Sequence, residues 1–459
     1  MEREGRQKTV GIVGATPVGL MAGYLLARHG WKVTLFEADP RQVGGHAREF
    51  TYNGYILDPV GYRFTATSPE VTPLWRAILP AEMLERPQVS RIYQRREFLP
   101  SPLDPAEAIR KLNLGDYGRC LASWLRMQIR PARGDDDFET WGRNRYGHHF
   151  FSLFFDPYID KIWGDYGREF PVDWVDRAEI AEESPRRPTP FLYPRRGPGR
   201  FWEACARQMV TLGGEIRLGQ PISRLLCDSC RRRWLVETAP SEGGGERVEV
   251  DHLISTLGMG ELLRALRPTP EDDLFCAAPA FRFRDLVLAA VMVPDEDRFR
   301  GSDLDIYEPT LRVGRILHYN AWSSAMIPVP GVACYGLQYF AKAGDACWIS
   351  RDEIILERAM RELATLGLAE PGEMVDGCVI RLRDVFAIHD RSQMHSNRFI
   401  RSHLRRAYPH LHLLDPHATR WNDGQQYAMG EVLQTVESLL DHPLSTPPAP
   451  PKTKHTVKQ

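Results

Sequence analysis

The sequence has no apolar run long enough to cross a membrane and almost no net charge. Its 459 residues contain no stretch of eighteen apolar residues, so we expect no membrane-spanning helix. Lys and Arg total 59 against 60 Asp and Glu, a net charge of −1. This bulk charge does not indicate binding to nucleic acid or to a membrane surface. The charged start, MEREGRQK, leads directly into an apolar segment, so we expect no signal peptide and a cytoplasmic location.

Cysteine is scarce, with 8 residues and one close pair, Cys227 and Cys230. A single CxxC without a second pair is weak support for zinc, and we expect no metal site. The pair lies between two strand-like runs, which predicts a hairpin tip with reduced thiols; a redox role is the alternative. The sequence has no internal repeat. The tail 446–459, rich in Pro and Lys, is predicted to be disordered.

The segment Thr9–Glu37 has the pattern of a dinucleotide-binding unit. Thr9–Val13 is β-branched and apolar, as a buried parallel strand requires, and Val18–His29 has apolar residues at helical spacing. Lys32–Phe36 reads as a second strand, with Glu37 at its end. Such a βαβ unit places pyrophosphate on the helix N-terminus and ribose hydroxyls on the terminal carboxylate.

The glycine turn of this unit departs from the Gly-x-Gly-x-x-Gly pattern at one position. Gly14 and Gly19 occupy the first and third places, but Thr16 occupies the second and Pro17 follows it. The middle glycine normally lets the backbone approach the phosphates. Threonine adds a branched side chain there, although its hydroxyl could bond a phosphate oxygen. The alternative is a βαβ unit with an empty site.

A second glycine pair narrows the predicted cofactor to FAD. Gly44 and Gly45, followed by Arg48, come soon after the terminal carboxylate. This resembles flavoproteins of the amine oxidase, protoporphyrinogen oxidase and UDP-galactopyranose mutase superfamily. Further backbone N–H groups would reach the pyrophosphate from its far side.

The resemblance implies an α/β fold, with a Rossmann-like FAD-binding domain of the GR2 type, a helical insertion and a second, mixed or antiparallel sheet. The FAD-binding domain is predicted to be discontinuous. The expected ranges are 1–75, 195–262 and 395–445 for the FAD-binding domain, 100–190 for the helical region, and 76–99 with 263–394 for the antiparallel-sheet substrate domain.

The helical region resembles the mutase group, whose Tyr-Thr-x-Lys-x-Trp-Gly run it nearly reproduces at 158–164. The resemblance implies that Trp163 stacks on a uracil and that Tyr158 lines the sugar-nucleotide cleft, with Ile159 where threonine is usual. Stacking of this kind is worth about 1–3 kcal/mol per base. The alternative is that these aromatic residues form a helix core.

Other substrate contacts are implied by the same resemblance. Arg195 and Arg196, in a glycine-rich loop, could bind a diphosphate bidentately, or could belong to an exposed basic loop. Arg284 resembles the arginine that holds the substrate diphosphate, although Asp285 could pair with it instead. Tyr193, at the start of the glycine-rich loop, is also expected to bind substrate, and Tyr307, Arg315 and Tyr339 lie on strands that would form the cleft wall.

Two further departures fall near the expected flavin. Gly61 keeps the glycine of a flavin-facing loop, but Tyr62 replaces the family histidine. Asp415 occurs where a Gly-Arg pair is usual, and like charges 4 Å apart cost about 4 kcal/mol at an effective dielectric near 20. Arg420 could compensate. The resemblance also places Ile222 and Gln426 at the cofactor, and Trp421, which replaces a tyrosine, at the substrate.

Three functions remain open. The first is a mutase-like flavoenzyme acting on a nucleotide-activated sugar, in which the flavin supplies the chemistry and no side-chain nucleophile is needed. The second is an oxidoreductase for a small-molecule substrate, with an apolar cleft lined by Phe150–Phe155 and Trp174. The third is a degenerate homologue with weak or no FAD binding. The oligomeric state stays open.

Overall fold

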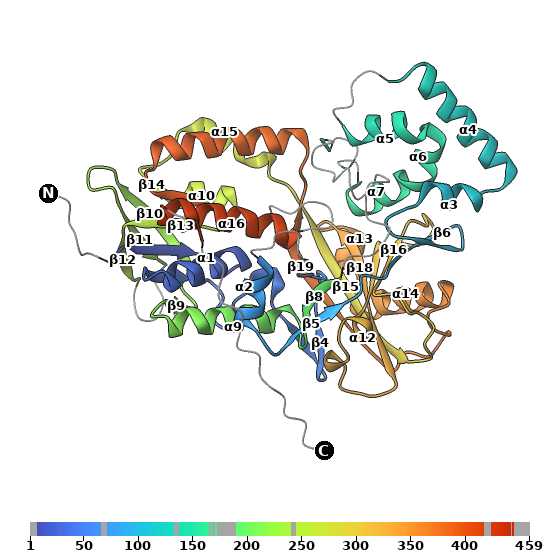
Figure 1. The fold of residues 1–459 in the computed structure, drawn as a ribbon, viewed down its shortest axis with the longest axis horizontal. Helices are drawn as coiled ribbons and strands as arrows, with labels where there is room; N and C mark the ends of the chain where they lie inside the picture. The colour runs from blue at the N-terminus through green and yellow to red at the C-terminus, as the bar shows by residue number, and fades with distance from the viewer. Residues whose placement is uncertain are drawn as a thin grey trace.

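A five-stranded parallel sheet forms the dinucleotide-binding part of the molecule (Figure 1). The computed structural model describes residues 7–65, 71–132, 137–164, 167, 170–171, 190–239, 245–416, 424–441 and 443–444. In sheet order the strands are β20 (Leu411–Leu413), β13 (His252–Ser255), β1 (Thr9–Val13), β2 (Lys32–Phe36) and β9 (Glu215–Arg217). Thus the strands come from three separated parts of the chain, so long-range pairing assembles this sheet.

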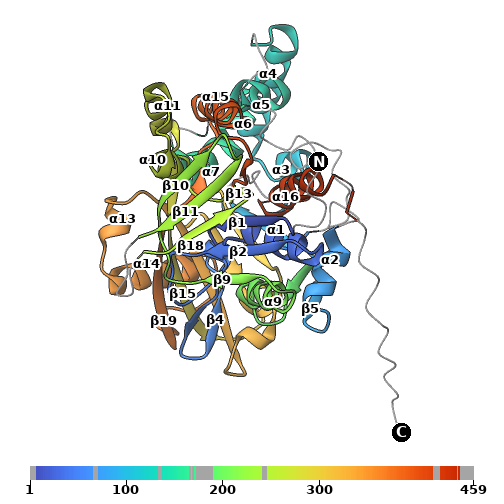
Figure 2. The ribbon, with the colours of Figure 1, turned by 90° about the vertical axis from the view of Figure 1, so that its left-hand side faces the viewer.

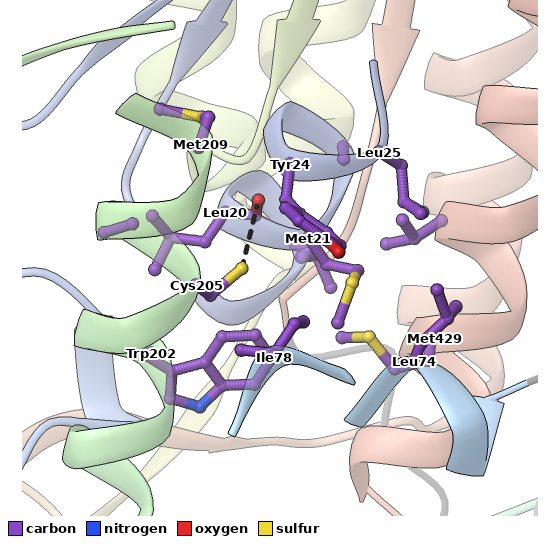
Figure 3. Packing of buried hydrophobic residues seen from close by; sticks show 14 of the residues in the cluster. Leu20, Met21, Tyr24, Leu25, Leu74, Ile78, Trp202, Cys205, Met209 and Met429 are labelled. Atoms are coloured by element: carbon purple, nitrogen blue, oxygen red, sulfur yellow. Dashed lines mark hydrogen bonds between the residues drawn. The ribbon is translucent and has the colours of Figure 1, made fainter. Parts of the chain in front are cut away.

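Four helices enclose the core next to this sheet. They are α1 (Pro17–Arg28), α2 (Val71–Ile78), α9 (Pro198–Thr211) and α16 (Gly424–Leu440). Figure 3 shows side chains of α1 between those of α9 and α16, with Trp202 and Met429 on opposite sides. The Cys205 thiol of α9 donates to the Leu20 carbonyl at 3.6 Å. Because α1 is buried almost all round, its position relative to β1 is tightly fixed.

A seven-stranded mixed sheet forms the second part, and α14 (Asp352–Thr365) packs on one of its faces. In sheet order the strands are β19 (Asp376–Ala387), β15 (Phe283–Pro294), β18 (Val332–Ala341), β17 (Arg315–His318), β16 (Asp303–Ile306), β6 (Ser90–Gln94) and β7 (Glu97–Pro100). Odd-numbered residues of β15 and β18 pack toward α14, and even-numbered ones face the rest of the molecule.

The helical region lies at one end of the molecule, away from the parallel sheet (Figure 1). Its helices are α3 (Pro105–Arg110), α4 (Leu114–Ile129), α5 (Phe138–Tyr146), α6 (His148–Phe154) and α7 (Asp156–Ile162). Phenylalanines of α5 and α6 form its core together with α7.

The remaining elements are smaller sheets and connecting helices (Figure 2). The strands are β3 (Phe50–Tyr52), β4 (Tyr55–Leu57), β5 (Met83–Arg86), β8 (Phe191–Pro194), β10 (Ile222–Asp228), β11 (Arg233–Thr238), β12 (Arg247–Val250) and β14 (Leu266–Arg267). The helices are α10 (Met259–Ala265), α11 (Asp272–Ala277), α12 (Tyr319–Trp322), α13 (Ala346–Ile349) and α15 (Arg391–Ala407), with short 3-10 turns at Gly45–Ala47, Ala278–Ala280 and Ser324–Met326.

The predicted fold class is confirmed, and two long elements were not expected from the sequence. The first is strand β19, whose charged residues Arg381 and Arg383 interrupt its apolar pattern; the second is helix α15. Cys227 and Cys230 lie at the β10–β11 hairpin, as predicted, with free thiols. Within the described ranges, no helix is both long and apolar enough to cross a membrane. The tail 446–459 lies outside the described residues.

Candidate flavin and substrate site

The glycine turn after β1 packs too closely for side chains at two positions. A Cβ on Gly14, whose φ is +95°, would lie 2.2 Å from Thr256 Oγ1. A Cβ on Gly19 would lie 2.3 Å from the carbonyl oxygen of Gly14. The first and third glycines therefore let α1 begin directly against the end of β1, as a phosphate-binding turn requires.

Thr16 occupies the middle position without backbone strain. It is the N-cap residue of α1, with φ −72° and ψ 167°, a conformation open to any residue. Its hydroxyl lies 3.4 Å from the Gly19 N–H, and its methyl lies 3.6 Å from where a Cβ of Gly45 would be. This turn therefore differs from the usual glycine pattern only in the volume of the Thr16 side chain at the N-terminus of α1. Pro17 begins the helix.

Glu37 and the second glycine pair both contact this turn. The Ala15 N–H donates to Glu37 Oε2 at 2.7 Å, and the Asp39 N–H donates to Oε1 at 2.9 Å. The Gly44 N–H donates to the Ala15 carbonyl at 2.7 Å, and Gly44 and Gly45 have φ values of +103° and +55°. The two glycine segments are separated in the sequence, but their backbones thus form one surface.

Arg48 is held beside this surface by an ion pair. Its guanidinium lies 2.6 Å from Asp39 and over the ring of Phe50. The Arg41 N–H, assisted by Arg48, lowers the pKa of the Asp39 carboxyl. Binding of a cofactor phosphate by Arg48 stays a prediction, and such binding would have to compete with Asp39.

The Gly61–Tyr62 turn is braced by a buried carboxylate. Asp58 is fully buried and accepts from the N–H groups of Gly61 and Tyr62, each at 2.9 Å, and from the Tyr193 hydroxyl at 3.2 Å. Burial raises the pKa of Asp58 to about 6. Burial also raises the pKa of Tyr62, which packs against the core around α1. Tyr193 therefore supports the turn from within.

Asp58 and the following residue are held by α12 and by strand β18 of the second sheet. The Tyr319 hydroxyl donates to the Asp58 carbonyl at 2.8 Å, and the Gln338 amide donates to the Pro59 carbonyl at 2.7 Å. Sequence reasoning missed Asp58. The available clue was a carboxylate just before a glycine loop, where it can accept several backbone N–H groups.

Tyr158 and Tyr307 meet on the inner face of the second sheet. The Tyr158 hydroxyl donates to Asp305 at 2.7 Å, and Arg315 pairs with the same carboxylate at 2.7 Å. The two tyrosine rings stack with their centroids 4.2 Å apart. Burial raises the pKa of both tyrosines. The structure thus brings together Tyr158, Tyr307 and Arg315, which the sequence predicted, around Asp305, which it did not.

Trp163 and Arg284 lie together where α7 meets the sheet. Trp163 is only 5% exposed, and its ring packs edge-on against Phe170 and Phe386. Arg284 donates to the carbonyls of Ile162 at 3.0 Å and Phe340 at 2.9 Å. The neighbouring carboxylate, Asp285, accepts instead from the N–H groups of Ala343 and Asp384.

Lys161, in the same run, donates to the carbonyls of Ile306 and Glu308, and burial lowers its pKa to about 8. These contacts join α7 to β16 and its following loop. They show that the run predicted to bind substrate also has a packing role.

Tyr339 is a correction to the expected cleft wall. Its side chain packs in the core beneath α14, and its hydroxyl donates to Glu362 at 2.8 Å. The adjacent Phe340 faces the helical region instead. Successive side chains of a strand alternate between faces, so an error of one residue reverses the assignment. Arg195 and Arg196 are exposed, and the Arg195 carbonyl accepts from Ser323 at 2.6 Å.

Some of the residues predicted to bind cofactor or substrate, most of them near the C-terminus, lie outside the described part of the structure. Asp415 follows β20 at the carboxyl end of the parallel sheet, and its N–H donates to Glu431 at 3.3 Å. Ile222 begins β10 in the four-stranded sheet and packs at the edge of that sheet's core. Arg420, Trp421 and Trp174 lie outside the described residues, as does the side chain of Gln426. Their proposed roles stay predictions.

Comparison with known proteins identifies the family. The model of the flavin-containing amine oxidoreductases matches residues 19–427. The chain belongs to this family. Its cofactor is FAD and it is an enzyme of the oxidoreductase superfamily, as the resemblance implied.

Individual relatives match this chain either over a short segment or at low sequence identity. Protoporphyrinogen oxidase 2 of Arabidopsis thaliana is 46% identical over 67 residues, which cover 15% of this chain but only 13% of that protein. A reduced UDP-galactopyranose mutase has the same fold, with a TM-score of 0.80, 19% identity, and coverage of 95% and 96% of the two chains. An Exiguobacterium protein described as a protoporphyrinogen oxidase gives a TM-score of 0.74, 16% identity, and coverage of 95% and 100%. At these identities the structures show the fold alone.

The residues at the glycine turn fit the FAD of this family. The close packing at Gly14 and Gly19 lets α1 begin directly against the end of β1, and the second glycine pair, with positive φ values, adjoins this turn. We therefore assign Gly14, Thr16, Gly19, Gly44 and Gly45 to the cofactor phosphates. FAD, when bound, supplies hydride or electron transfer at its ring. The chain would contribute the positive end of α1 for the phosphates and, as the sequence predicts, the carboxylate of Glu37 for the ribose.

Replacing Thr16 by glycine is expected to tighten FAD binding at least tenfold. Removal of the side chain opens the backbone to one more charge-assisted hydrogen bond, worth about 1.5–3 kcal/mol. The stability loss should be only a few tenths of a kcal/mol, as for an N-cap Thr→Gly change. Fluorescence titration of apoprotein with FAD measures the change. Thr16→Ala, which keeps the Cβ, is the matched control. Equal affinity of Thr16→Gly and the wild type would show that this side chain does not limit binding.

Proposed function

We propose that this protein is an FAD-dependent oxidoreductase that oxidises an uncharged or largely apolar small molecule. The observation that carries the proposal is the pairing of charge on the inner face of the second sheet. Arg315 is bound by Asp305 at 2.7 Å, and Arg63 is bound by the buried Asp303 at 2.5 Å. An arginine that is already paired with a carboxylate gains little net electrostatic energy from binding a substrate diphosphate.

The aromatic residues at the end of α7 support the same proposal. Trp163, Phe340 and Phe386 lie together there, with their rings in contact in one hydrophobic cluster. In this function these residues exclude water from the substrate and hold it by apolar contact. The braced Gly61–Tyr62 turn would hold the cofactor ring on the other side. No side-chain nucleophile is required.

A mutase acting on a sugar nucleotide is the second candidate, and the position of Arg284 favours it. A Cβ on Gly164 would lie 3.8 Å from the Arg284 guanidinium, so this cation reaches the loop just after Trp163. In this function Arg284 would bind the diphosphate and Trp163 would stack on the uracil. The present packing of the Trp163 ring does not permit this stacking, so the side chain would have to turn.

One experiment separates the candidates. Flavin absorbance is followed anaerobically with uncharged or largely apolar hydride donors, and UDP binding is followed by calorimetry. We expect a hydride donor to reduce the flavin and so bleach its absorbance. We expect UDP to bind with a Kd of about 1 mM or weaker, because arginines already paired with carboxylates offer little net electrostatic gain. Tight UDP binding that Arg284→Ala abolishes would support the mutase instead. Arg381→Ala is the matched control, since Arg381 also donates to backbone carbonyls, at Trp348 and Ser350. A colourless protein that takes up no FAD would contradict both.

A further inference from the structure

Helix α4 exposes an apolar face that no other described part of the chain covers. Of its 16 residues only Asp116 and Cys120 are buried. Leu114 and Ile129, near its two ends, are 90% and 77% exposed. Helical spacing places four further side chains on the same face, each at least 40% exposed: Tyr117, Leu121, Trp124 and Leu125. Apolar patches of this kind mark sites where another molecule binds.

The charged residues of α4 lie away from this face. At about 100° per residue, Arg119, Arg126 and Arg130 fall nearly opposite the apolar side chains. Asp116 is buried and pairs with Arg95 and Arg119. The apolar face therefore carries no charge of its own. A second copy of the face can approach it without bringing like charges together, whereas a charged partner would find nothing complementary on it.

The middle of the face has the spacing of a seam between two helices. Leu114, Gly118, Leu121, Leu125 and Gln128 recur at alternating intervals of four and three residues, as the a and d positions of a coiled coil do. Gly118 is exposed, and a Cβ there would meet no atom within 4 Å. Glycine within a helix costs stability relative to alanine, and no described neighbour of Gly118 requires it. A second helix packed closely on this face would require it.

A groove beside the face can receive side chains of a second helix. Its volume is about 760 Å³, and its lining includes Tyr117, Leu121 and Trp124 of α4, Ile109 of α3 and Trp141 of α5. Both overall views place α4 at the outer edge of the helical region, where another copy can reach it (Figures 1 and 2). The face and the groove together give a ridge and a hollow on one surface, which two copies can fit into one another.

The area is what a weak dimer needs. The exposed parts of the six apolar side chains amount to on the order of 500 Å² in one copy. Two copies would bury roughly 1,000 Å² in total, the smallest area expected of a specific interface. A dimer that forms through this face alone is therefore expected to dissociate on dilution.

We propose that two copies of this chain pair through α4, with the two helices antiparallel about a two-fold axis near Leu121 and Leu125. An interface of this symmetry is self-complementary, and a two-fold dimer is the commonest oligomer. The antiparallel arrangement also brings opposite ends of the two helix dipoles together. Leu114 then lies beside Ile129 of the partner subunit, so the two most exposed side chains of the face cover each other. The inference does not rest on the proposed oxidoreductase activity.

Sedimentation of the full-length holoprotein over a range of concentrations tests the pairing. We expect a dimer that dissociates on dilution. Leu121→Glu with Leu125→Glu should weaken it about a hundredfold or more, because like charges then meet at the axis. Ile349→Glu with Val375→Glu, at residues 70% and 61% exposed elsewhere, is the matched control and should leave the dimer unchanged.

Cysteine cross-linking tests the antiparallel arrangement. A mixture of Leu114→Cys and Ile129→Cys proteins should cross-link rapidly with a short bifunctional maleimide. Leu114→Cys protein alone should not, because the two positions 114 then lie about 20 Å or more apart along the helices. Wild-type protein treated in parallel corrects for the exposed thiols of Cys230 and Cys276.

A wild-type protein that stays monomeric at every concentration overturns the proposal. So does a dimer that the two α4 glutamates leave intact, since it forms through another surface. Cross-linking of Leu114→Cys protein with itself, without cross-linking in the mixture, overturns the antiparallel pairing. Retained flavin absorbance and unfolding temperature show that the variants are folded, and the single cysteine variants test the interface even if the paired glutamates disturb α4.

Discussion

Substitution of Gly19 by alanine is expected to abolish FAD binding and to lower the free energy of unfolding by about 3 kcal/mol. The added Cβ would lie 2.3 Å from a backbone oxygen, that of Gly14, and backbone cannot rotate away as a side chain can. Relief requires α1 to move off β1. Because α1 is buried against α9 and α16, that movement disrupts the core as well as the phosphate-binding turn.

Urea unfolding and flavin content of the purified variant measure both effects. Gly430→Ala is the matched control, since Gly430 lies within α16 and a Cβ there meets no atom within 4 Å. The control should keep its FAD and gain about 0.5–1 kcal/mol from alanine's better helix propensity. A yellow Gly19→Ala protein of wild-type stability would refute the assignment of this turn.

Acid is expected to destabilise the protein through a cluster of histidines at the other end of the parallel sheet. His252 Nδ1 lies 3.2 Å from His412 Nε2, and the rings of His252 and His410 stack 4.3 Å apart. Burial, helped by the neighbouring His410, lowers the pKa of His252 to about 3 and that of His412 to about 4. Lys8 and Arg405 add to this effect, whereas Asp251 opposes it for His252.

The direction of this pH dependence of stability follows from proton binding. Between about pH 6.5 and pH 4 the unfolded chain binds protons at these two histidines while the folded chain does not, so stability rises with pH. Stability is complete above pH 6.5 and falls below it, by at most about 1.4 kcal/mol per pH unit for each histidine. Partial solvent exposure of His252 reduces its share.

Urea unfolding at several pH values measures this slope. His252→Phe keeps an aromatic ring beside Trp31 and should flatten the acid limb. His148→Asn, at an exposed imidazole, should leave the slope unchanged. If His252→Phe and the wild type lose stability in parallel, the acid sensitivity arises elsewhere.

The sequence alone determined the dinucleotide-binding unit. Its strand, glycine turn, helix and terminal carboxylate are encoded within 29 residues, from Thr9 to Glu37. Local spacing suffices there, because the hydrophobic period and the glycine positions specify the elements and the turn together. The same holds for the second glycine pair, and the family match agrees with the cofactor that these segments predicted.

Only the tertiary structure decided which of the residues predicted to bind substrate face one another. Tyr158 bonds Asp305 across 147 residues, and Arg284 reaches the carbonyl of Ile162 across 122. Tyr339 and Phe340 point to opposite faces of β18, and which of them meets the helical region depends on the register of the sheet. Partner choice over such separations is set by strand pairing and packing, which the residue types do not specify. The glycine turn is specified by residues close together in the sequence and could be predicted from them, whereas the pairing of charges on the inner face of the second sheet joins distant residues and required the fold.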